Sequence, residues 1–531
     1  AARADLVLVN GTVVTLDSLR PTAQAIAIAG GRVTATGTTR DIRALAGPRT
    51  RVIDLRGRTA VPGFADGHLH DAGGGPGLDL SATRSIDELL GVIASASRQA
   101  KRGEVLYTNS DWHEAQLAEH RLPLRAELDR AAPTVPVVVV RGGHEMLLNS
   151  AALTRFHIMK ETPVPAGGRI SRDASGELTG ELVDRAMDLV DRPPETPLSA
   201  ETVRAQLARL NAAGLTSIRI PGGTADEYRI LREMHDRRQL TMRVSYLFRL
   251  TDASSPDAVR AQVRSWGVAP VEGDEWLRVG GVKLGVDGGF EGGWMRTPYE
   301  EPMGRGGTYR GLQTMSEPDF LTATRTLNSL GWRVATHAVG DAAIDLVLRG
   351  YAAANAEHPI AGKRWAVEHA FIARPEHLHA MKELGLVVSA QNHLWLAGPV
   401  LVKYWGAERA ALTTPMRSFV DSGLVVGTGT DSPVVPYPPL KTFYHFTTRR
   451  TISGGTLGAD QAVSRLTALR AATWGNAYLT GEEASKGTLA VGQLADLAVL
   501  SDNIMTCSDD ALDRVQVELT IVGGRVVWQR R

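Results

Sequence analysis

The sequence predicts an α/β fold: a TIM-type (β/α)8 barrel with a β-sandwich beside it. Through the middle of the chain, short apolar strands alternate with helical stretches, which is typical of parallel βα units. Both ends of the chain instead show short strands separated by turns. A chain of 531 residues is long enough for a barrel with an insertion and one further domain.

Eight apolar segments between residues 63 and 479 are candidates for the barrel strands. They are Phe64 to His70, Thr216 to Ile220, Met242 to Phe248, Val279 to Lys283, Arg333 to His337, Ala366 to His369, Val387 to Ser389 and Val425 to Thr428. In such a barrel the reactive side chains lie at the carboxyl ends of the strands. We therefore expect the active site at that mouth.

A long insertion follows the first predicted barrel strand, at about residues 72–200. It contains two further apolar stretches, Val105 to Tyr107 and Val137 to Val140, which the count of eight leaves over. Long segments of this kind in compact domains are commonly lids over active sites. We expect the insertion to cover the mouth of the barrel.

The two ends of the chain, residues 1–62 and 480–531, carry strand patterns. The first begins with Leu6 to Val9 and turns at Asn10-Gly11, and the last turns at Gly523-Gly524. Chain ends commonly lie close together in space. We therefore expect the two segments to form one composite β-sandwich, with two independent caps as the alternative.

Composition excludes several classes of partner. The 59 basic and 58 acidic residues nearly cancel, so no overall field favours nucleic acid or an anionic membrane. No apolar run is long enough to cross a bilayer. We expect a cytoplasmic protein that binds a small-molecule substrate. The sequence leaves the oligomeric state open, with a symmetric homo-oligomer as the ordinary prior. Because the chain begins at Ala1, a removed export signal is the alternative.

A lone cysteine, Cys507, excludes a disulfide framework and a cysteine-based zinc site. Any metal must therefore be held by histidine and carboxylate. The sharpest candidate is His68-Leu-His70, where the period-two alternation of a strand places both imidazoles on one face. Two histidines so placed can bind one metal ion.

Three further polar residues end predicted barrel strands. His337 and His369 close the fifth and sixth strands, and Asp431 follows the eighth. Taken singly, each is better explained as a hydrogen-bonded residue at a strand end. Together with the His68 pair they converge on one mouth, which indicates a metal site.

Lys283 ends the fourth predicted strand. An ammonium group has no lone pair and cannot bind a metal. Its deprotonated amine could take up carbon dioxide, giving a carbamate whose two oxygens could bridge two metal ions. The alternatives are a salt bridge to Asp287 or Asp431, or a contact to a substrate carboxylate.

The ordered set of His-x-His, Lys, His, His and Asp resembles the amidohydrolase superfamily, and more narrowly its amidohydrolase 3 branch, which includes N-substituted formamide deformylases. The resemblance covers nearly the whole chain. Its motifs are residues 52–70, 142–152, 336–341, 368–369, 429–433 and 487–500. The chain departs from the pattern at residues 288–294, where relatives often have a shorter loop, and this departure concerns the pocket wall.

The resemblance implies a two-metal centre. His68 and His70 would hold the more buried metal with Asp431, His337 and His369 would hold the second, and a carboxylated Lys283 would bridge them. Zinc is the usual ion for such ligands, and manganese, iron or cobalt would also suit them. One metal alone would still permit hydrolysis.

The predicted reaction is metal-dependent hydrolysis of an amide-type carbonyl–nitrogen bond, with Asp431 as general base. His144, in the insertion, is the candidate partner for the carbonyl oxygen as its charge grows, with an ordinary loop histidine as the alternative. Trp112, Trp294 and His393 are candidates for substrate binding, and packing tryptophans are an equally good account. Alternatives are attack on an ester, a carbon–carbon bond or a ring amine by the same site, and a non-catalytic scaffold.

Overall fold

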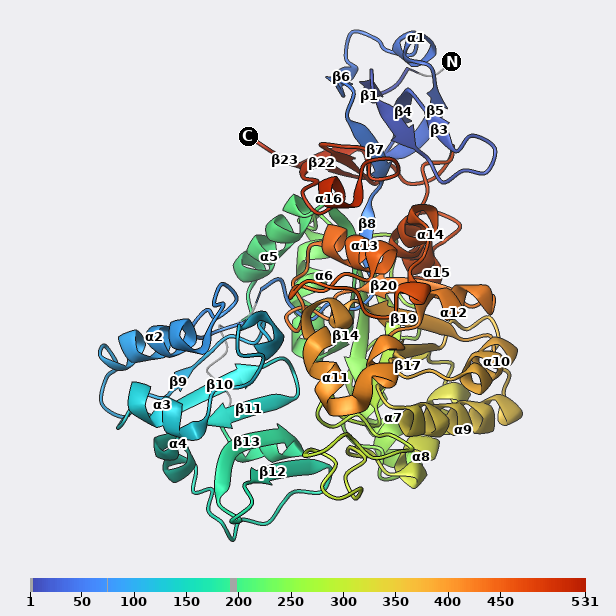
Figure 1. Ribbon diagram of the computed structural model, residues 1–531. Helices are drawn as coiled ribbons and strands as arrows, with labels where there is room; N and C mark the ends of the chain where they lie inside the picture. Colours follow the sequence, from blue (N-terminus) through green and yellow to red (C-terminus); the bar gives the residue numbers. More distant parts are fainter. Residues whose placement is uncertain (1–2, 74, 192–197) are drawn as a thin grey trace.

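A computed structural model describes residues 3–73, 75–191 and 198–531 (Figure 1). Its centre is a sheet of eight parallel strands, paired in chain order. The strands are β8 (Phe64–Asp66), β14 (Leu215–Gly223), β15 (Arg243–Arg249), β16 (Leu277–Gly285), β17 (Val334–Ala338), β18 (Ala366–His369), β19 (Val387–Gln391) and β20 (Val425–Gly429). All eight predicted strands are present, which confirms the fold class.

The barrel closes between β8 and β20. The Gly67 N–H donates to the Thr428 carbonyl over 2.9 Å, and Leu69 forms a parallel bridge with Ser432. The Asn476 amide joins the two strands, because its Nδ2 donates to the Ala65 carbonyl at 2.7 Å and to the Thr428 carbonyl at 2.8 Å. Closure aligns the carboxyl ends of all eight strands around one mouth.

One strand is shorter than predicted. β8 ends at Asp66, so His68 and His70 lie on the loop beyond it and not on a regular strand. Asp66 causes this early exit, because its buried carboxylate accepts the His68 N–H at 2.9 Å and the Thr430 hydroxyl at 2.6 Å. These side-chain bonds replace the strand ladder beyond Asp66.

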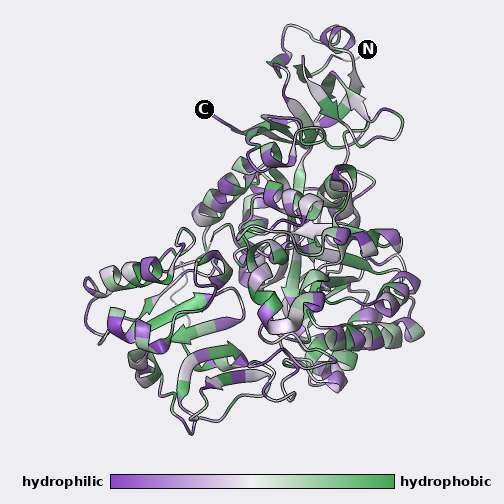
Figure 2. Ribbon diagram, in the orientation of Figure 1, coloured by the Kyte–Doolittle hydropathy of each residue, from purple (hydrophilic) through white to green (hydrophobic). Residues whose placement is uncertain are grey.

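Helices surround the barrel (Figure 1). They are α5 (Ala200–Ala212), α6 (Ala225–Asp236), α7 (Pro256–Ser265), α8 (Glu317–Ser329), α9 (Asp341–Glu357), α10 (Pro375–Glu383), α11 (His393–Ala411), α12 (Met416–Asp421), α13 (Pro439–Thr448), α14 (Arg465–Arg470) and α15 (Asn476–Thr480). Many begin at a side-chain cap: Ser316, for example, accepts from the Asp319 N–H and starts α8. Their apolar faces pack on the strands, and Figure 2 shows the polar faces outward.

Both ends of the chain build the β-sandwich. One sheet has the order β23-β22-β21-β7-β2-β3 and the other β5-β4-β1-β6. Their bounds are β1 (Leu6–Val9), β2 (Thr12–Val14), β3 (Thr22–Ala23), β4 (Ala25–Ala29), β5 (Arg32–Gly37), β6 (Arg51–Asp54), β7 (Thr59–Pro62), β21 (Leu497–Leu500), β22 (Val517–Val522) and β23 (Arg525–Gln529), with α1 (Thr39–Arg43) and α16 (Asp509–Leu512) at the edges. Because β7 pairs with β21, the ends form one composite unit and the alternative of two independent caps is wrong. The boundaries at residues 62 and 480 stay predictions.

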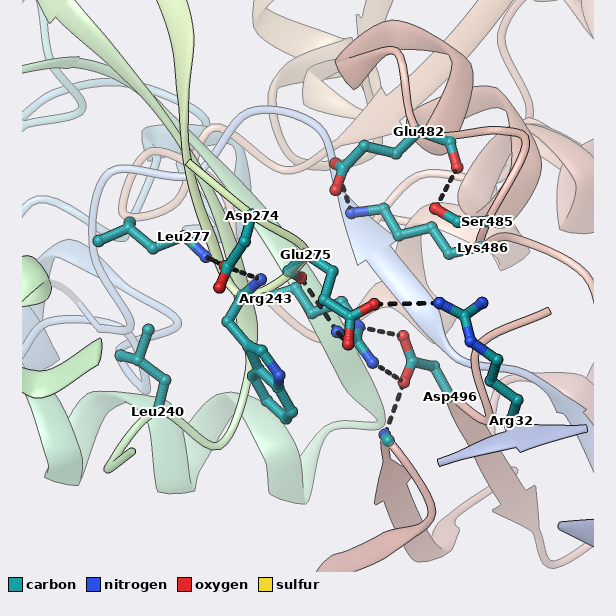
Figure 3. A network of polar contacts seen from close by, with 12 residues as sticks. Arg32, Leu240, Arg243, Asp274, Glu275, Leu277, Glu482, Ser485, Lys486 and Asp496 are labelled. Atoms are coloured by element: carbon teal, nitrogen blue, oxygen red, sulfur yellow. Dashed lines mark hydrogen bonds and ion pairs between the residues drawn. The ribbon is translucent and has the colours of Figure 1, made fainter. Parts of the chain in front are cut away.

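A buried ion pair joins the β-sandwich to the barrel (Figure 3). Arg243, on β15, places Nε 2.6 Å from Asp496 Oδ2 and Nη2 3.0 Å from Asp496 Oδ1. Asp496 also accepts the Gly523 N–H at 2.8 Å. Both charged side chains are buried, so each depends on the other for its hydrogen bonds.

Replacing Arg243 by alanine should lower the free energy of unfolding by about 3 to 5 kcal/mol, because Asp496 would stay buried without its partner. The matched control is Arg32→Ala, which breaks the exposed pair of Arg32 and Glu275 and should cost less than about 1 kcal/mol. Urea unfolding of both variants measures the difference. Equal losses of unfolding free energy in the two variants would show that the buried pair stabilises the protein no more than the exposed pair does.

The insertion forms a five-stranded sheet of its own, in the order β12-β13-β11-β10-β9. Its elements are α2 (Ile86–Ser97), β9 (Leu106–Tyr107), α3 (Arg125–Ala131), β10 (Val137–Arg141), β11 (Glu145–Leu148), α4 (Ser150–Arg155), β12 (Gly168–Arg172) and β13 (Leu178–Asp184). The predicted stretches at Val105 and Val137 are β9 and β10. Within the described ranges, no helix is both long and apolar enough to span a bilayer.

Candidate metal centre and pocket

Asp431 stands at the centre of the barrel mouth. It follows β20 with a φ of 61°, a left-handed conformation that non-glycine residues rarely adopt. Asp431 Oδ1 lies 3.2 Å from His68 Nε2 and 3.1 Å from His70 Nε2, and Oδ2 lies 3.1 Å from His393 Nε2. Three imidazoles thus meet at one carboxylate.

Two groups of potential ligand atoms lie within 4.8 Å of one another in the described part of the chain. The first consists of His68, His70 and Asp431, the same three residues that the sequence assigns to the more buried metal. The second consists of His369, His393 and Asp431. The sequence assigns His337 to that second position and His393 to substrate binding.

His337 lies beside this second group. Its ring centroid is 4.5 Å from that of His369, but its Nε2 donates to the Gly288 carbonyl at 3.1 Å. That bond leaves Nδ1 as the nitrogen with a free lone pair. The structure therefore brings all the predicted histidines together and adds His393 to them as a candidate ligand.

His68 is oriented by a buried carboxylate. Its Nδ1 lies 2.5 Å from Glu368 Oε2, so the ring donates there and presents Nε2 to Asp431. Glu368 Oε1 accepts from Arg219 Nη1 at 2.6 Å. Burial opposes the ionisation of Glu368, but Arg219 and His68 hold its pKa well below the usual range. This chain of partners is what a histidine ligand needs to keep one orientation.

The imidazoles are suited to binding a cation. Burial lowers the pKa of His70, His337, His369 and His393, which keeps these rings neutral with a lone pair free. The Nδ1 atoms of His369 and His393 are buried without a hydrogen-bond partner among the residues that the structure describes. Neutral imidazoles and one carboxylate match the ligand set of zinc and related divalent ions.

Lys283, at the end of β16, lies at the same mouth with its Nζ 3.4 Å from His68 Nε2. Burial lowers the pKa of Lys283 to about 8, although Glu368 and Asp431 act in the opposite direction. The alternative of a salt bridge to Asp287 is wrong, because that carboxylate accepts the N–H groups of Val339 at 3.0 Å and Gly340 at 2.9 Å. Lys283 is thus an amine that deprotonates easily beside the candidate ligands.

A pocket opens beside the candidate metal centre. It is lined by Arg141, Gly142, Gly143, His144, Gly289, Phe290, Glu291, His337, Val339, His369, Phe371, His393, Asp431 and Val434. The wall therefore comes from the barrel mouth, from the insertion and from the loop after β16. The aromatic rings of Phe290 and Phe371 give it an apolar side.

His144 enters the pocket from the insertion, between β10 and β11. Its ring centroid lies 5.2 Å from that of His337. His144 Nδ1 lies 2.6 Å from Asp184 Oδ1, at the end of β13. Burial alone would lower the pKa of His144, but Asp184 raises it above the usual value. The pair favours an imidazolium facing the metal centre.

Glycines make room for this pair. A Cβ at Gly288 or Gly292 would collide with the Asp184 carboxylate, and one at Gly289 would collide with the His144 ring. These three glycines belong to the segment at residues 288–294. The glycine-rich loop after β16 is thus shaped around His144 and Asp184.

Two predicted substrate-binding residues lie elsewhere. Trp112 is fully buried in the apolar core of the insertion, where its indole N–H donates to the Val140 carbonyl at 2.8 Å. Trp294 packs partly buried against the barrel core. Neither is among the described residues that line the pocket. The buried position of Trp112 corrects it to a packing residue, and a substrate-binding role of Trp294 stays a prediction.

The sequence patterns do not indicate every candidate functional residue of the site. They give no role to Arg219, Asp184 or Glu291, and they include Glu368 only as part of a motif. Each is an ionisable side chain within or directly after an apolar strand or in a glycine-rich loop, which is the one signal that could have found them. Their partners lie about 40 to 150 positions away along the chain, so no local pattern reveals the contacts.

Comparison with known proteins agrees with this geometry. The model of the Amidohydrolase family matches residues 51–528. The N-substituted formamide deformylase of Arthrobacter pascens is 29% identical over 99% of this chain and 98% of its own length. The protein LONG AFTER FAR-RED 3 of Arabidopsis thaliana is 29% identical over 99% of this chain and 92% of its own length.

A solved structure shares the fold. An uncharacterized metal-dependent hydrolase from Pyrococcus horikoshii superposes with a TM-score of 0.69 at 23% identity, over 95% of this chain and 99% of that one. The family match spans nearly the whole chain, including every candidate ligand. This chain belongs to the amidohydrolase family, and its similarity to a formamide deformylase supports a hydrolase that acts on carbon–nitrogen bonds.

Proposed function

We propose that this enzyme hydrolyses the amide bond of a small N-substituted amide, of the formamide type, with an apolar or aromatic substituent. The observation that carries the proposal is the meeting of His68, His70 and His393 at Asp431, beside a pocket with aromatic walls. The similarity to an N-substituted formamide deformylase over 99% of this chain supports the bond type.

The ligand residues fit a divalent metal, because their imidazole rings are neutral and, in His369 and His393, have a nitrogen without a hydrogen-bond partner among the described residues. His68, His70 and Asp431 would hold one ion, and His369 with His393 or His337 would hold a second, with zinc as the expected metal. A carbamate on Lys283 would bridge the two. When bound, such a metal supplies a Lewis acid that acidifies water and polarises a carbonyl.

Asp431 is the proposed general base. Its Oδ2 faces His393, and burial in the mouth places the carboxylate next to the space where water and substrate would meet. Asp431 accepts the proton of the attacking water and then delivers it to the leaving nitrogen. His393 Nε2, 3.1 Å from Asp431 Oδ2, can donate to the carboxylate and hold it in position.

His144 is the proposed partner of the substrate oxygen. An imidazolium on the pocket wall can donate to the carbonyl oxygen as its negative charge grows. Asp184 fixes the ring through Nδ1, so Nε2 is the nitrogen left for the substrate. Asp184 therefore acts on the reaction only through His144.

Replacing Asp184 by asparagine should lower kcat by about tenfold to a hundredfold with little change in KM, because His144 would lose its charge and orientation. The measurement is steady-state kinetics of the variants D184N, H144N and both combined. The double variant should be no slower than H144N, since both substitutions remove the same interaction, the donation from His144 that Asp184 supports. Additive losses would contradict a shared role.

A panel of N-benzylformamide, the matching benzyl formate ester and a ring amine tests the proposed bond type. The proposal predicts release of formate and benzylamine from the amide at the highest kcat/KM. Preference for the ester or the ring amine would overturn it. A metal-loaded chain inactive on the whole panel would favour the non-catalytic alternative, which the presence of all six predicted ligand positions opposes.

A further inference from the structure

A buried cluster of charges lies in the pocket wall, away from the candidate metal ligands. Arg141, at the end of β10, contacts three carboxylates. Its Nε lies 3.1 Å from Glu114 Oε2, and its Nη2 pairs with Glu145 Oε2 and with Glu291 Oε1. Arg141 is 3% exposed and the three glutamates at most 1%. The insertion supplies three of these residues, and the loop after β16 supplies Glu291.

The cluster has more acidic than basic groups. Three carboxyl groups face one guanidinium. Arg169 and Glu181, 2.5 Å apart, lie beside the cluster, and Glu181 also hydrogen-bonds with Glu145. Burial raises the pKa of Glu145 and of Glu291, against the opposing effect of Arg141. One ion pair would be enough to hold the insertion against the loop after β16. The additional carboxyl groups therefore indicate a role beyond this contact.

Glu291 connects this cluster to the pocket. Both Glu291 and Arg141 line the pocket, and the ring of the adjacent Phe290 lies 5.5 Å from that of His393. Glu291 Oε1 is engaged by Arg141, but Oε2 is fully buried and has no hydrogen-bond partner among the described residues. A buried carboxylate oxygen without a donor is costly in a folded protein. Its place on the pocket wall indicates that a ligand supplies the missing donor.

We infer that Glu291, backed by Glu114 and Glu145, forms a subsite for the amine portion of the substrate and binds the amine product as an ammonium ion. The inference rests on the proposed amide hydrolysis. In that reaction R–NH–CHO and water give R–NH₂ and formic acid: the C–N bond breaks, a C–O bond forms, and the proton reaches the nitrogen. Near neutral pH the two products ionise to R–NH₃⁺ and formate.

The chemistry of the wall matches that product. An ammonium group has three N–H donors and one positive charge, which suit the Glu291 oxygen on the pocket wall that has no partner among the described residues. The substrate amide N–H offers one donor to the same oxygen. His144, His337, His369, His393 and Asp431 line the same pocket as Glu291, so a substrate whose nitrogen contacts Glu291 would have its carbonyl within the same pocket.

The same wall should exclude anionic substituents. A carboxylate on the nitrogen side would approach three carboxylates, while the only guanidinium among the described residues that line the pocket is already occupied by them. The site is therefore predicted to favour amides of neutral or basic amines and to reject N-acyl amino acids. N-benzylformamide and N-formylphenylglycine, which differ by one carboxylate, are a matched pair of substrates for this selectivity.

The experiment compares the binding of benzylamine and benzyl alcohol, a cation and its neutral isostere, by calorimetry near pH 7. It uses the full chain, both metal-loaded and metal-depleted, so that an amine bound directly to a metal is recognised. The native protein should bind benzylamine about tenfold or more tightly than the alcohol in both states. Glu291→Gln should bring the two affinities together. Glu482→Gln, which removes a buried carboxylate outside the pocket and the cluster, should leave the preference intact.

Affinities within about twofold for the native protein would overturn the inference, and this holds even if Glu291→Gln does not fold. Equal effects of Glu291→Gln and Glu482→Gln would also overturn it, because the preference would then not depend on the carboxyl groups of this cluster. A preference for amine together with no turnover of any formamide would support the subsite and contradict the proposed reaction. The two claims can therefore fail separately.

Discussion

Replacing Asp431 by asparagine is expected to lower kcat by about 10² to 10⁴-fold while the protein stays folded. Asparagine keeps the size and one oxygen of aspartate, but its amide cannot accept the proton of the attacking water at neutral pH. His68, His70 and His393 would also lose a charged partner. Steady-state kinetics with N-benzylformamide, together with thermal unfolding, measure the two effects.

The control for Asp431→Asn is the same substitution at a second buried carboxylate of the barrel mouth. Asp287→Asn is suitable, since Asp287 accepts backbone N–H groups of Val339 and Gly340 and is not in either group of potential ligands. That variant should lose stability more than rate. Activity of Asp431→Asn within about tenfold of the native enzyme would show that Asp431 is not the general base.

Substitution of Lys283 should have a comparably large effect. Neither methionine nor arginine can form a carbamate, since methionine has no amine and the guanidinium stays protonated. Both Lys283→Met and Lys283→Arg should therefore lose activity by about a hundredfold or more, with weaker metal retention. Native protein stripped of metal should regain more activity when the metal is returned with bicarbonate than without it.

The arginine variant separates the two possible roles of Lys283. If Lys283 acts as a positive charge, for example toward Asp431, the Lys283→Arg protein should keep much of the activity that Lys283→Met loses. A large residual activity in Lys283→Arg, or no effect of bicarbonate on the native protein, would contradict the carbamate. The lowered pKa of about 8 favours the carbamate, because carbon dioxide reacts with the neutral amine.

The barrel was predictable because its strands are apolar on both faces, so each appears in the sequence as a short uninterrupted run. Polar residues that end such runs are conspicuous. His337, His369 and Asp431 stand out in this way, and the alternation around His68 and His70 adds two more. These five and Lys283 needed only the rule that parallel strands end at one mouth.

The rest of the site depends on contacts between distant segments. His393 begins α11 just after β19 and meets Asp431 only because the barrel closes. Glu291 lies in an irregular loop and gains its partner Arg141 from the insertion, 150 positions away. The prediction that Trp112 binds substrate is wrong, because the sequence does not distinguish a tryptophan in the core of a long insertion from one in a pocket wall. Trp112 lies in the core of the insertion.

The central claim is that His68, His70, His369, His393 and Asp431 bind catalytic metal, and metal analysis of the dialysed protein tests it most directly. We predict one to two tightly bound divalent ions per chain, because the structure has two groups of potential ligands. His68→Ala should lose both metal and activity. Less than about one tight metal per chain in the native protein, with no loss on His68→Ala, would contradict the account.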